Sequence, residues 1–274
     1  MKKKIIFGTY NLDIGGIETA LVSLLNNLDY SKYEVYLFLV KKEGIFLNQL
    51  SQNVKIIDFN ICESKNIIYR KFRNLVKLLY FKTKYKNKFD FSAAYGTSVK
   101  ACTKLAHHFS KNNAIWIHGD FTLMFPEKKE FNNFLRFISF HKYKKNIFVA
   151  HSIKRSFENK HVKLAEKTYV FNNFIDADRI IKLSKEEKIK KEKLTFLNVS
   201  RHEELQKNLF MLFRVVKRLV NDGFDFNVWM IGDGIDHQKY VDYVNENKLS
   251  GVVKFLGKKA NPFVYYKAAD ALLL

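Results

Sequence analysis

The sequence predicts an α/β fold made of two domains, each built on a parallel sheet. Short runs rich in Val, Ile and Phe alternate with helical patterns almost from end to end. Apolar strands separated by helices are typical of parallel sheets that are covered on both faces. The length of 274 residues suits two ordinary domains. The highly charged segment 184–193 interrupts the alternation once, and it reads as a linker or a solvated helix.

The first predicted domain covers residues 1–175 and has an α/β pattern. We expect its strands at Lys4–Thr9, Tyr33–Val40, Val54–Asp58, Asp90–Ala94, Ala114–His118, Asn146–Val149 and Thr168–Phe171. We expect its helices at residues 17–29, 65–86, 98–110, 127–141 and 152–159. The strands are short and continuous in Val, Ile and Phe, and helices separate most of them, which predicts a parallel sheet covered on both faces.

A linker over residues 176–193 leads to the second predicted domain, residues 194–274. We expect strands at Leu194–Ser200, Asp225–Ile231, Val252–Phe255 and Asp270–Leu274, with helices at residues 208–221, 236–248 and 262–268. The last strand ends in three leucines, and no crossover helix follows it. A buried parallel strand needs cover on both faces, so we expect this domain to be incomplete.

The net charge of +21 indicates a polyanionic neighbour: nucleic acid, an anionic membrane surface or phosphorylated substrates. Part of the charge reflects a general bias towards Lys, Asn, Ile and Phe. No stacking or groove-reading module is recognisable, so we do not expect nucleic acid. Cys62 and Cys102 alone cannot form a disulfide framework or a four-ligand zinc site. No apolar run reaches the ~18 residues of a membrane span. The shortage of cysteines makes the cytoplasm the default compartment.

Gly15 and Gly16 follow the first strand. Paired glycines let the backbone turn sharply and approach a ligand, and the N–H groups of the following helix attract anions. The alternative is a tight strand-to-helix turn without a ligand. The spacing from Thr9 to Gly16 does not match the Gly-x-Gly-x-x-Gly dinucleotide fingerprint.

His118 ends the fifth predicted strand, just before Gly119 and Asp120. Polar groups at the carboxyl edge of a parallel sheet face the crevice where ligands of open α/β sheets bind. His118 can act there on a sugar hydroxyl or a departing phosphate. The alternative is a capping or buried structural histidine.

Arg201 lies just past a strand end, and Lys207 is expected at the start of the next helix. Two cations beside helix N–H donors suit a diphosphate, whereas the alternative is an ordinary pair of surface charges. The residues after Arg201 lack a His-Glu-x-x-His spacing, which disfavours zinc. Gly232 and Gly234 follow the next strand, but His237 stands where a dinucleotide fingerprint needs its third glycine, so NAD is disfavoured.

The segment Lys65–Lys88 carries nine Lys or Arg residues and no acid. At helical spacing its apolar stripe consists of Ile68, Phe72, Leu75, Val76 and Leu79, with Arg70, Arg73, Lys77 and Lys84 on the opposite side. A basic amphipathic helix suits an anionic bilayer surface. An ordinary helix packed on the sheet explains the stripe equally well.

Taken together, these motifs resemble glycosyltransferase family 4, whose members have the GT-B fold of two Rossmann-like domains. The matching pieces are Gly15-Gly16-x-Glu18, Trp116-Ile117-His118, Phe171-Asn172-Asn173-Phe174-Ile175-Asp176, Arg201 with Lys207, Gly232-Asp233-Gly234, Val253-Lys254-Phe255-Leu256-Gly257, Asn261-Pro262 and Tyr265 to Asp270. Each piece is weakly specific, but their order and spacing hold over essentially the whole chain.

The resemblance implies retaining transfer of a sugar from a nucleoside diphosphate sugar, UDP-linked by expectation, without a metal or other cofactor. Arg201 and Lys207 would hold the donor diphosphate and neutralise the leaving charge, and His118 would contact the donor sugar. The implied donor-binding positions are Gly15, Gly16, Asn173, Gly232 and Gly234. The first domain would serve the acceptor, and the second domain would bind the nucleotide sugar.

The resemblance also implies a glycan or lipid-linked acceptor and a cytoplasmic location, peripheral on the inner face of the membrane. The family pattern continues after the position of Leu274 with two carboxylates eight positions apart, which contact the donor sugar and the ribose. We therefore expect reduced activity from these 274 residues. The alternative is a non-catalytic remnant of such an enzyme that binds a membrane or a partner.

Overall fold

The computed structural model describes residues 1–97, 99–160 and 166–274. Contacts within the chain divide it into two compact units, Met1–Ile175 and Asp176–Leu274, and each is described by itself. The predicted helix 98–110 begins at Ser98, which lies outside the described residues. Both units consist of parallel strands joined by helices, so the predicted α/β fold with two Rossmann-like parts is confirmed.

The first unit contains every strand and helix expected from its sequence, with ends that differ by a few residues. Its strands are β1 (Lys3–Thr9), β2 (Tyr33–Leu39), β3 (Lys55–Asp58), β4 (Phe91–Ala94), β5 (Asn113–Ile117), β6 (Lys145–Phe148) and β7 (Thr168–Val170). Its α-helices are α1 (Gly16–Asn26), α2 (Ile67–Lys84), α3 (Lys100–Phe109), α4 (Phe121–Met124), α5 (Lys128–Phe137) and α6 (His151–Lys160). Two short 3-10 helices, η1 (Ile45–Gln49) and η2 (Phe140–Lys142), and the single turn α4 were not predicted.

Among the described residues, the first unit forms a seven-stranded parallel sheet in the order β3-β2-β1-β4-β5-β6-β7. The chain winds outward from β1 to β3 and then returns to the other side of β1 with β4. This reversal creates a switch point between β1 and β4, where the loops after the two strands diverge. Ligands of open α/β sheets bind at the carboxyl edge of such a point.

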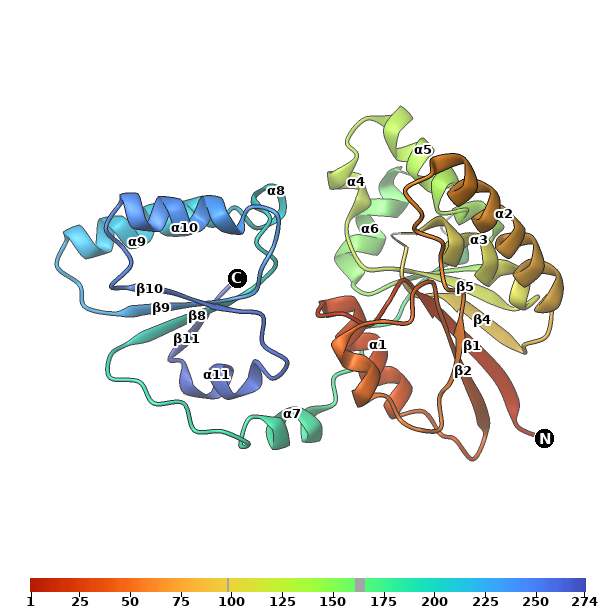
Figure 1. Ribbon diagram of the computed structural model, residues 1–274, viewed down its shortest axis with the longest axis horizontal. Coiled ribbons are helices and arrows are strands. Elements are labelled where there is room, and N and C mark those ends of the chain that lie inside the picture. Colours follow the sequence, from red (N-terminus) through yellow and green to blue (C-terminus); the bar gives the residue numbers. More distant parts are fainter. Residues whose placement is uncertain (98, 161–165) are drawn as a thin grey trace. The chain divides into compact units, whose positions relative to one another are not determined.

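Alternate residues of the central strands supply two separate cores. Ile6 and Phe38 pack with α2, α3, α5 and α6, whereas Ile5, Phe7 and Leu37 pack with α1 and η1. Figure 1 shows α1 on one face of this sheet and the other helices on the opposite face. The near-continuous apolar strands follow from this arrangement, because both faces of the sheet are buried.

The second unit begins with α7 (Ala177–Leu183), inside the segment predicted as linker. The side chain of Asp176 caps this helix by accepting a hydrogen bond from the backbone N–H of Arg179 at 3.0 Å. The charged segment 184–193 that follows contains no helix, so the solvated-helix alternative is wrong for it.

The remaining elements of the second unit follow the predicted alternation. The strands are β8 (Thr195–Val199), β9 (Asn227–Ile231), β10 (Val253–Gly257) and β11 (Ala271–Leu273). The helices are α8 (Glu204–Lys207), α9 (Leu209–Asn221), α10 (His237–Glu246) and α11 (Phe263–Ala268), of which the short α8 was not predicted.

Within residues 176–274, the four strands form a parallel sheet in the order β10-β9-β8-β11, with its switch point between β8 and β11. Val228 and Met230 face α9 and α10, and Trp229 and Ile231 face the opposite side, where Tyr265 of α11 packs. Figure 1 shows the same division of helices between the two faces. The loops after β8, β9 and β10 therefore share the carboxyl edge of this sheet.

Candidate functional site

The first unit brings polar residues together at the carboxyl ends of β1, β4 and β5. The register pairs Gly8 with Ala94, and Ala94 with Ile115, so these strands end at nearly the same level. Tyr95 follows β4, and His118 follows β5 directly. The predicted position of His118 at the carboxyl edge is therefore confirmed, whereas its role remains a prediction.

Gly15 precedes α1 as its N-cap with an extended backbone, and its carbonyl accepts hydrogen bonds from the N–H and Oγ1 of Thr19. The side chain of Glu18 folds back over Gly15. A Cβ placed on Gly15 would therefore lie 2.2 Å from Glu18 Oε2. A Cβ on Gly16 would meet nothing within 4 Å. The Glu18 side chain is flexible and could move aside, so packing requires glycine at neither position, and Gly16 leaves open space above the helix N-terminus.

A second loop fixes the approach to this turn. The N–H of Leu12 donates to the carbonyl of Glu43 at 2.9 Å, and the N–H of Phe46 donates to the carbonyl of Leu12 at 3.0 Å. Gly44 has φ +117°, and a Cβ there would lie 2.1 Å from the carbonyl carbon of Leu12. Glycine is therefore the residue that allows this close approach.

Tyr95 links the predicted residues of the first unit. Its hydroxyl donates to Asn173 Oδ1 at 3.3 Å, and its ring centroid lies 4.6 Å from that of His118. Burial and the negative charge of Glu18 raise the pKa of Tyr95 well above its ordinary value. Sequence reasoning missed Tyr95, although its place directly after a strand matches that of His118.

His118 is held as a neutral imidazole. Its Nε2 donates to the backbone carbonyl of Tyr95 at 3.1 Å, which leaves Nδ1 as an acceptor. Burial lowers the pKa of His118 to about 4, because the charged form would lose its hydration. Nδ1 is itself buried and has no hydrogen-bond partner among the described residues. This geometry suits the structural alternative, while Nδ1 keeps an unused electron pair.

Arg201 and Lys207 lie in the segment after β8, Arg201 in the loop and Lys207 at the end of the short helix α8. The side chain of Arg201 is 64% exposed and forms an ion pair with Glu203 at 3.5 Å. Lys207 is exposed, but it ends the four-residue helix α8 instead of starting the next helix as we predicted. The difference arises at Asn208, whose left-handed backbone (φ 48°) separates α8 from α9.

The N-terminus of α9 is partly occupied by a carboxylate of the same unit. Glu204 Oε2 accepts from the backbone N–H of Phe210 at 3.2 Å and from the hydroxyl of Tyr240 at 2.9 Å. An anion at this edge would therefore depend mainly on the side chains of Arg201 and Lys207. The exposed ion pair of Arg201 is weak enough for a phosphate to replace it.

Gly232 and Gly234 allow the loop after β9 to touch the loop after β8. Gly232 has φ +138°, and a Cβ there would lie 1.9 Å from the carbonyl oxygen of Ser200. A Cβ on Gly234 would lie 2.2 Å from the carbonyl oxygen of His202. The structure therefore gives both glycines a packing role beside Arg201, and contact with a ligand remains a prediction.

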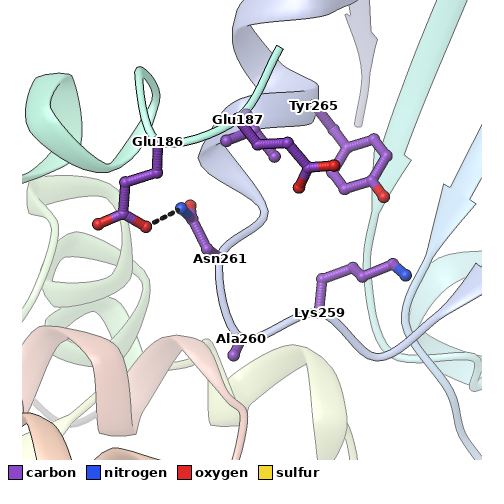
Figure 2. A pocket seen from close by; sticks show the side chains of 7 residues that line it. Glu186, Glu187, Lys259, Ala260, Asn261 and Tyr265 are labelled. Carbon is purple, nitrogen blue, oxygen red and sulfur yellow. Dashed lines mark hydrogen bonds between the residues drawn. The ribbon is translucent and has the colours of Figure 1, made fainter. Parts of the chain in front are cut away.

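The third loop at this edge, after β10, lines a pocket of about 540 Å³ shown in Figure 2. Asn261 Nδ2 donates to the carbonyl of Leu183 at 2.9 Å and to Glu186 Oε2 at 3.0 Å. Lys259 Nζ lies 5.8 Å from the centroid of the Tyr265 ring. The complete lining is Glu186, Glu187, Lys259, Ala260, Asn261, Val264 and Tyr265. Two carboxylates and one ammonium make this pocket less suited to a diphosphate than the loop of Arg201.

No group of three or more metal-ligating side chains gathers anywhere in the described part of the chain. None of the described helices is both long and apolar enough to cross a bilayer.

The sequence is similar to that of an uncharacterized glycosyltransferase of Methanocaldococcus jannaschii, with 28% identity over 141 residues. The match covers 49% of this chain and 34% of the relative, so it spans about a third of the length of that protein. No family model matches the chain.

The fold is similar to several solved glycosyltransferase structures. HepE of Anabaena, crystallised in complex with UDP-glucose, has a TM-score of 0.72 at 15% identity over 98% of this chain and 73% of its own. TarM, known from S. aureus, has a TM-score of 0.73 at 11% identity over 99% of this chain and 80% of its own. WaaG, a glycosyltransferase involved in lipopolysaccharide biosynthesis, has a TM-score of 0.61 at 12% identity, covering 98% of this chain and 74% of its own. These findings confirm the resemblance to glycosyltransferases with the GT-B fold that the motifs predicted.

Proposed function

We propose that this chain is a retaining glycosyltransferase that moves a sugar from a nucleoside diphosphate sugar, UDP-linked, to a glycan or lipid-linked acceptor. The observation that carries the proposal is the pair of exposed cations, Arg201 and Lys207, in the loop after β8. That loop lies at the switch point of a Rossmann-like sheet, where anionic ligands of such folds bind. The likeness to HepE, which was crystallised with UDP-glucose, supports the same donor class.

The chemistry would be electrostatic. Breaking the bond between the sugar and the diphosphate leaves negative charge on the phosphate oxygens, and that charge grows towards the transition state. A guanidinium and an ammonium held beside these oxygens stabilise the transition state more than the bound donor. Arg201 offers a planar fork of N–H groups for two oxygens, and Lys207 adds a point charge. No metal is needed for this role.

The first unit would bind uncharged parts of the substrates. Tyr95, His118 and Asn173 are neutral hydrogen-bonding groups, and Glu18 brings a carboxylate close to them. A carboxylate repels a phosphate but accepts hydrogen bonds from sugar hydroxyls. We place the donor sugar or the acceptor near these residues, with Gly15 and Gly16 allowing the close approach of the backbone.

The exposed face of α2 supports a peripheral position on the cytoplasmic face of an anionic membrane, where lipid-linked acceptors would be reached. The apolar stripe projects from the unit instead of packing on it, with Ile68 82% and Phe72 62% exposed. The same observation favours a second candidate function, membrane or partner binding without catalysis. The two functions are separated by sugar transfer, which only the first requires.

Binding of UDP and UDP-glucose to the 274-residue chain, measured by isothermal titration calorimetry, tests the donor site. Each of Arg201→Ala and Lys207→Ala should weaken binding about tenfold, because a charge-assisted hydrogen bond contributes roughly 1.5 to 3 kcal/mol. Arg218→Ala and Lys217→Ala are the matched controls, since both lie in α9 and remove the same charges away from the loop after β8. Unchanged affinity in both loop variants would remove the site from consideration.

A further inference from the structure

His202 and His237 form a pair of imidazoles beside Arg201, in which His202 is buried and His237 is half-buried. The Nδ1 atoms of the two rings lie 2.7 Å apart, and the rings are stacked with an interplanar angle of 14°. His202 is 0% exposed, although a histidine in a loop usually reaches solvent. Tyr240 and Phe255 pack edge-on against the His202 ring and hold it in place.

The pair spans the two loops that build the proposed diphosphate site. His202 belongs to the loop after β8, and His237 begins α10 after the loop from β9. The backbone repeats the connection, because the N–H of His202 donates to the carbonyl of Asp233 at 3.0 Å and the N–H of Asp236 donates to the carbonyl of His202 at 3.1 Å. The two loops are already connected by these backbone hydrogen bonds and by the close packing of Gly234 on His202. The hydrogen bond between the imidazoles adds a side-chain connection.

The bond between the rings requires one proton between two nitrogens. One Nδ1 must carry hydrogen and donate, and the other Nδ1 must be bare and accept. A pair in which both Nδ1 atoms carry hydrogen cannot form this bond, and two imidazolium charges at 2.7 Å would repel each other. Acid therefore breaks the bond, whereas neutral pH preserves it.

The charged groups around the pair are engaged elsewhere. The Asp236 carboxylate accepts from Lys239 Nζ at 2.7 Å and from the N–H of Glu204 at 2.9 Å. The Glu204 carboxylate accepts from Tyr240, as described above. Asp233 adds a negative charge that favours the imidazolium, but its Oδ1 accepts from the N–H of Gly234. Burial and the charge of His237 outweigh it and lower the pKa of His202 to about 4.

We propose that His202 and His237 are a positioning pair, whose shared proton locks the Arg201 loop to the Gly232–Gly234 loop, and that protonation of both rings releases the lock. The link between the loops is supported by the contact between the imidazoles and by the backbone hydrogen bonds beside it. Its consequence for a diphosphate rests on the proposed function, because it acts through Arg201.

NMR of the isotope-labelled chain tests the lock without any ligand. As the pH falls, the backbone amide signals of Arg201, Gly232 and Gly234 should shift with the same midpoint as the imidazole signals of His202. The variant His237→Phe keeps a ring at this position, and the double variant H202F/H237F also avoids an unpaired buried nitrogen. Both should abolish the shared midpoint. The matched control is His108→Phe, which alters one ring of the close His107–His108 pair in the first unit, whose ring centroids lie 4.1 Å apart, and should leave these signals unchanged.

A double-mutant cycle that measures UDP affinity tests whether the imidazole pair acts through Arg201. His237→Phe should weaken UDP binding about fivefold at neutral pH, the effect of one lost hydrogen bond, and less than twofold when Arg201 is already alanine. The proposed link between the loops would be overturned if the amide signals of Arg201, Gly232 and Gly234 did not change with the titration of the imidazoles. If Arg201→Ala leaves UDP binding unchanged or the chain does not bind UDP, the proposed function fails while the NMR result still decides the lock.

Discussion

At the residue scale, the glycines divide into those that the backbone needs and those that it tolerates. Gly44, Gly223, Gly232 and Gly257 all have positive φ values, which disfavour any residue with a side chain. Among these four, only Gly44 and Gly232 also face a neighbouring backbone closely, since a Cβ on Gly223 or on Gly257 would meet nothing within 4 Å. The two contact glycines lie in or beside the loops of the candidate sites, and Gly223 ends a surface helix.

Gly232→Ala should therefore destabilise the chain far more than Gly223→Ala. Both variants carry the strain of a left-handed backbone, about 1 kcal/mol, but only the first drives a methyl group into the carbonyl oxygen of Ser200. We expect Gly232→Ala to lower the free energy of unfolding by about 3 kcal/mol or more in urea titrations. Equal effects of the two variants would show that the loops do not press together.

At the element scale, α2 has a packing face and a separate exposed stripe. Its inner face contacts the unit through Leu78 and Phe81, and Lys77 Nζ donates to the backbone carbonyl of Asn60. Asn74 adds hydrogen bonds with both backbone groups of Cys62. The sequence alone left open whether the apolar stripe packs on the sheet. In the structure the stripe does not pack on the sheet of its own unit. The exposed stripe consists of Ile68, Phe72, Leu75, Val76 and Leu79.

The position of the stripe predicts binding to anionic vesicles. The chain should co-sediment with vesicles that contain roughly one third phosphatidylglycerol, and less with neutral vesicles, because each nearby cation adds about 1 kcal/mol of attraction. I68S/F72S and R70E/R73E should each reduce the bound fraction severalfold. The matched controls are L205S/I235S, which removes two exposed apolar side chains of the second unit, and K188E/K190E, which reverses two exposed charges there. If the variants and the controls lost the same fraction of vesicle binding, the binding would come from the overall charge and hydrophobicity of the chain and not from α2.

At the scale of the whole molecule, each unit keeps a histidine near its candidate site whose surroundings disfavour the charged imidazolium. Burial lowers the pKa of His118 and of His202 to about 4, below the ordinary value of 6.5. Between these values the unfolded chain binds more protons than the folded chain. The contribution of these two histidines to stability is therefore fully present above about pH 6.5 and is lost as the pH drops towards 4.

Acidification from about pH 7.5 to about pH 5 should lower the free energy of unfolding by about 2 kcal/mol for each of the two histidines. Trp116 and Trp229 report the two units separately, because one tryptophan lies in each. In a Trp229→Phe background, His118→Gln should reduce the pH dependence of the Trp116 transition in urea, and the part that remains is expected from His107 and His108, whose pKa values burial also lowers. His141→Gln, which alters an exposed histidine of the same unit, should not change it. The same slope in both variants would contradict the assignment to His118.

The sequence anticipated most of the architecture, because parallel sheets buried on both faces produce strands such as β2 and β9 that are apolar at nearly every position. It missed the short helices α4 and α8, since four residues are too few to display a helical period. Likewise, α7 was read as linker because its exposed residues carry no buried stripe. Arg201 and His118 could be chosen as candidates because each is a polar residue directly after an apolar strand.

What the sequence determined by itself is the alternation of strands and helices and the positions of the glycine turns and cations, all of which depend on local spacing. Only the tertiary structure decided which groups meet: Tyr95 with His118 and Asn173, and His202 with His237. It also decided that the stripe of α2 faces outward. Such contacts join residues distant along the chain through the order of strands in a sheet, and no local pattern of residue types encodes that order.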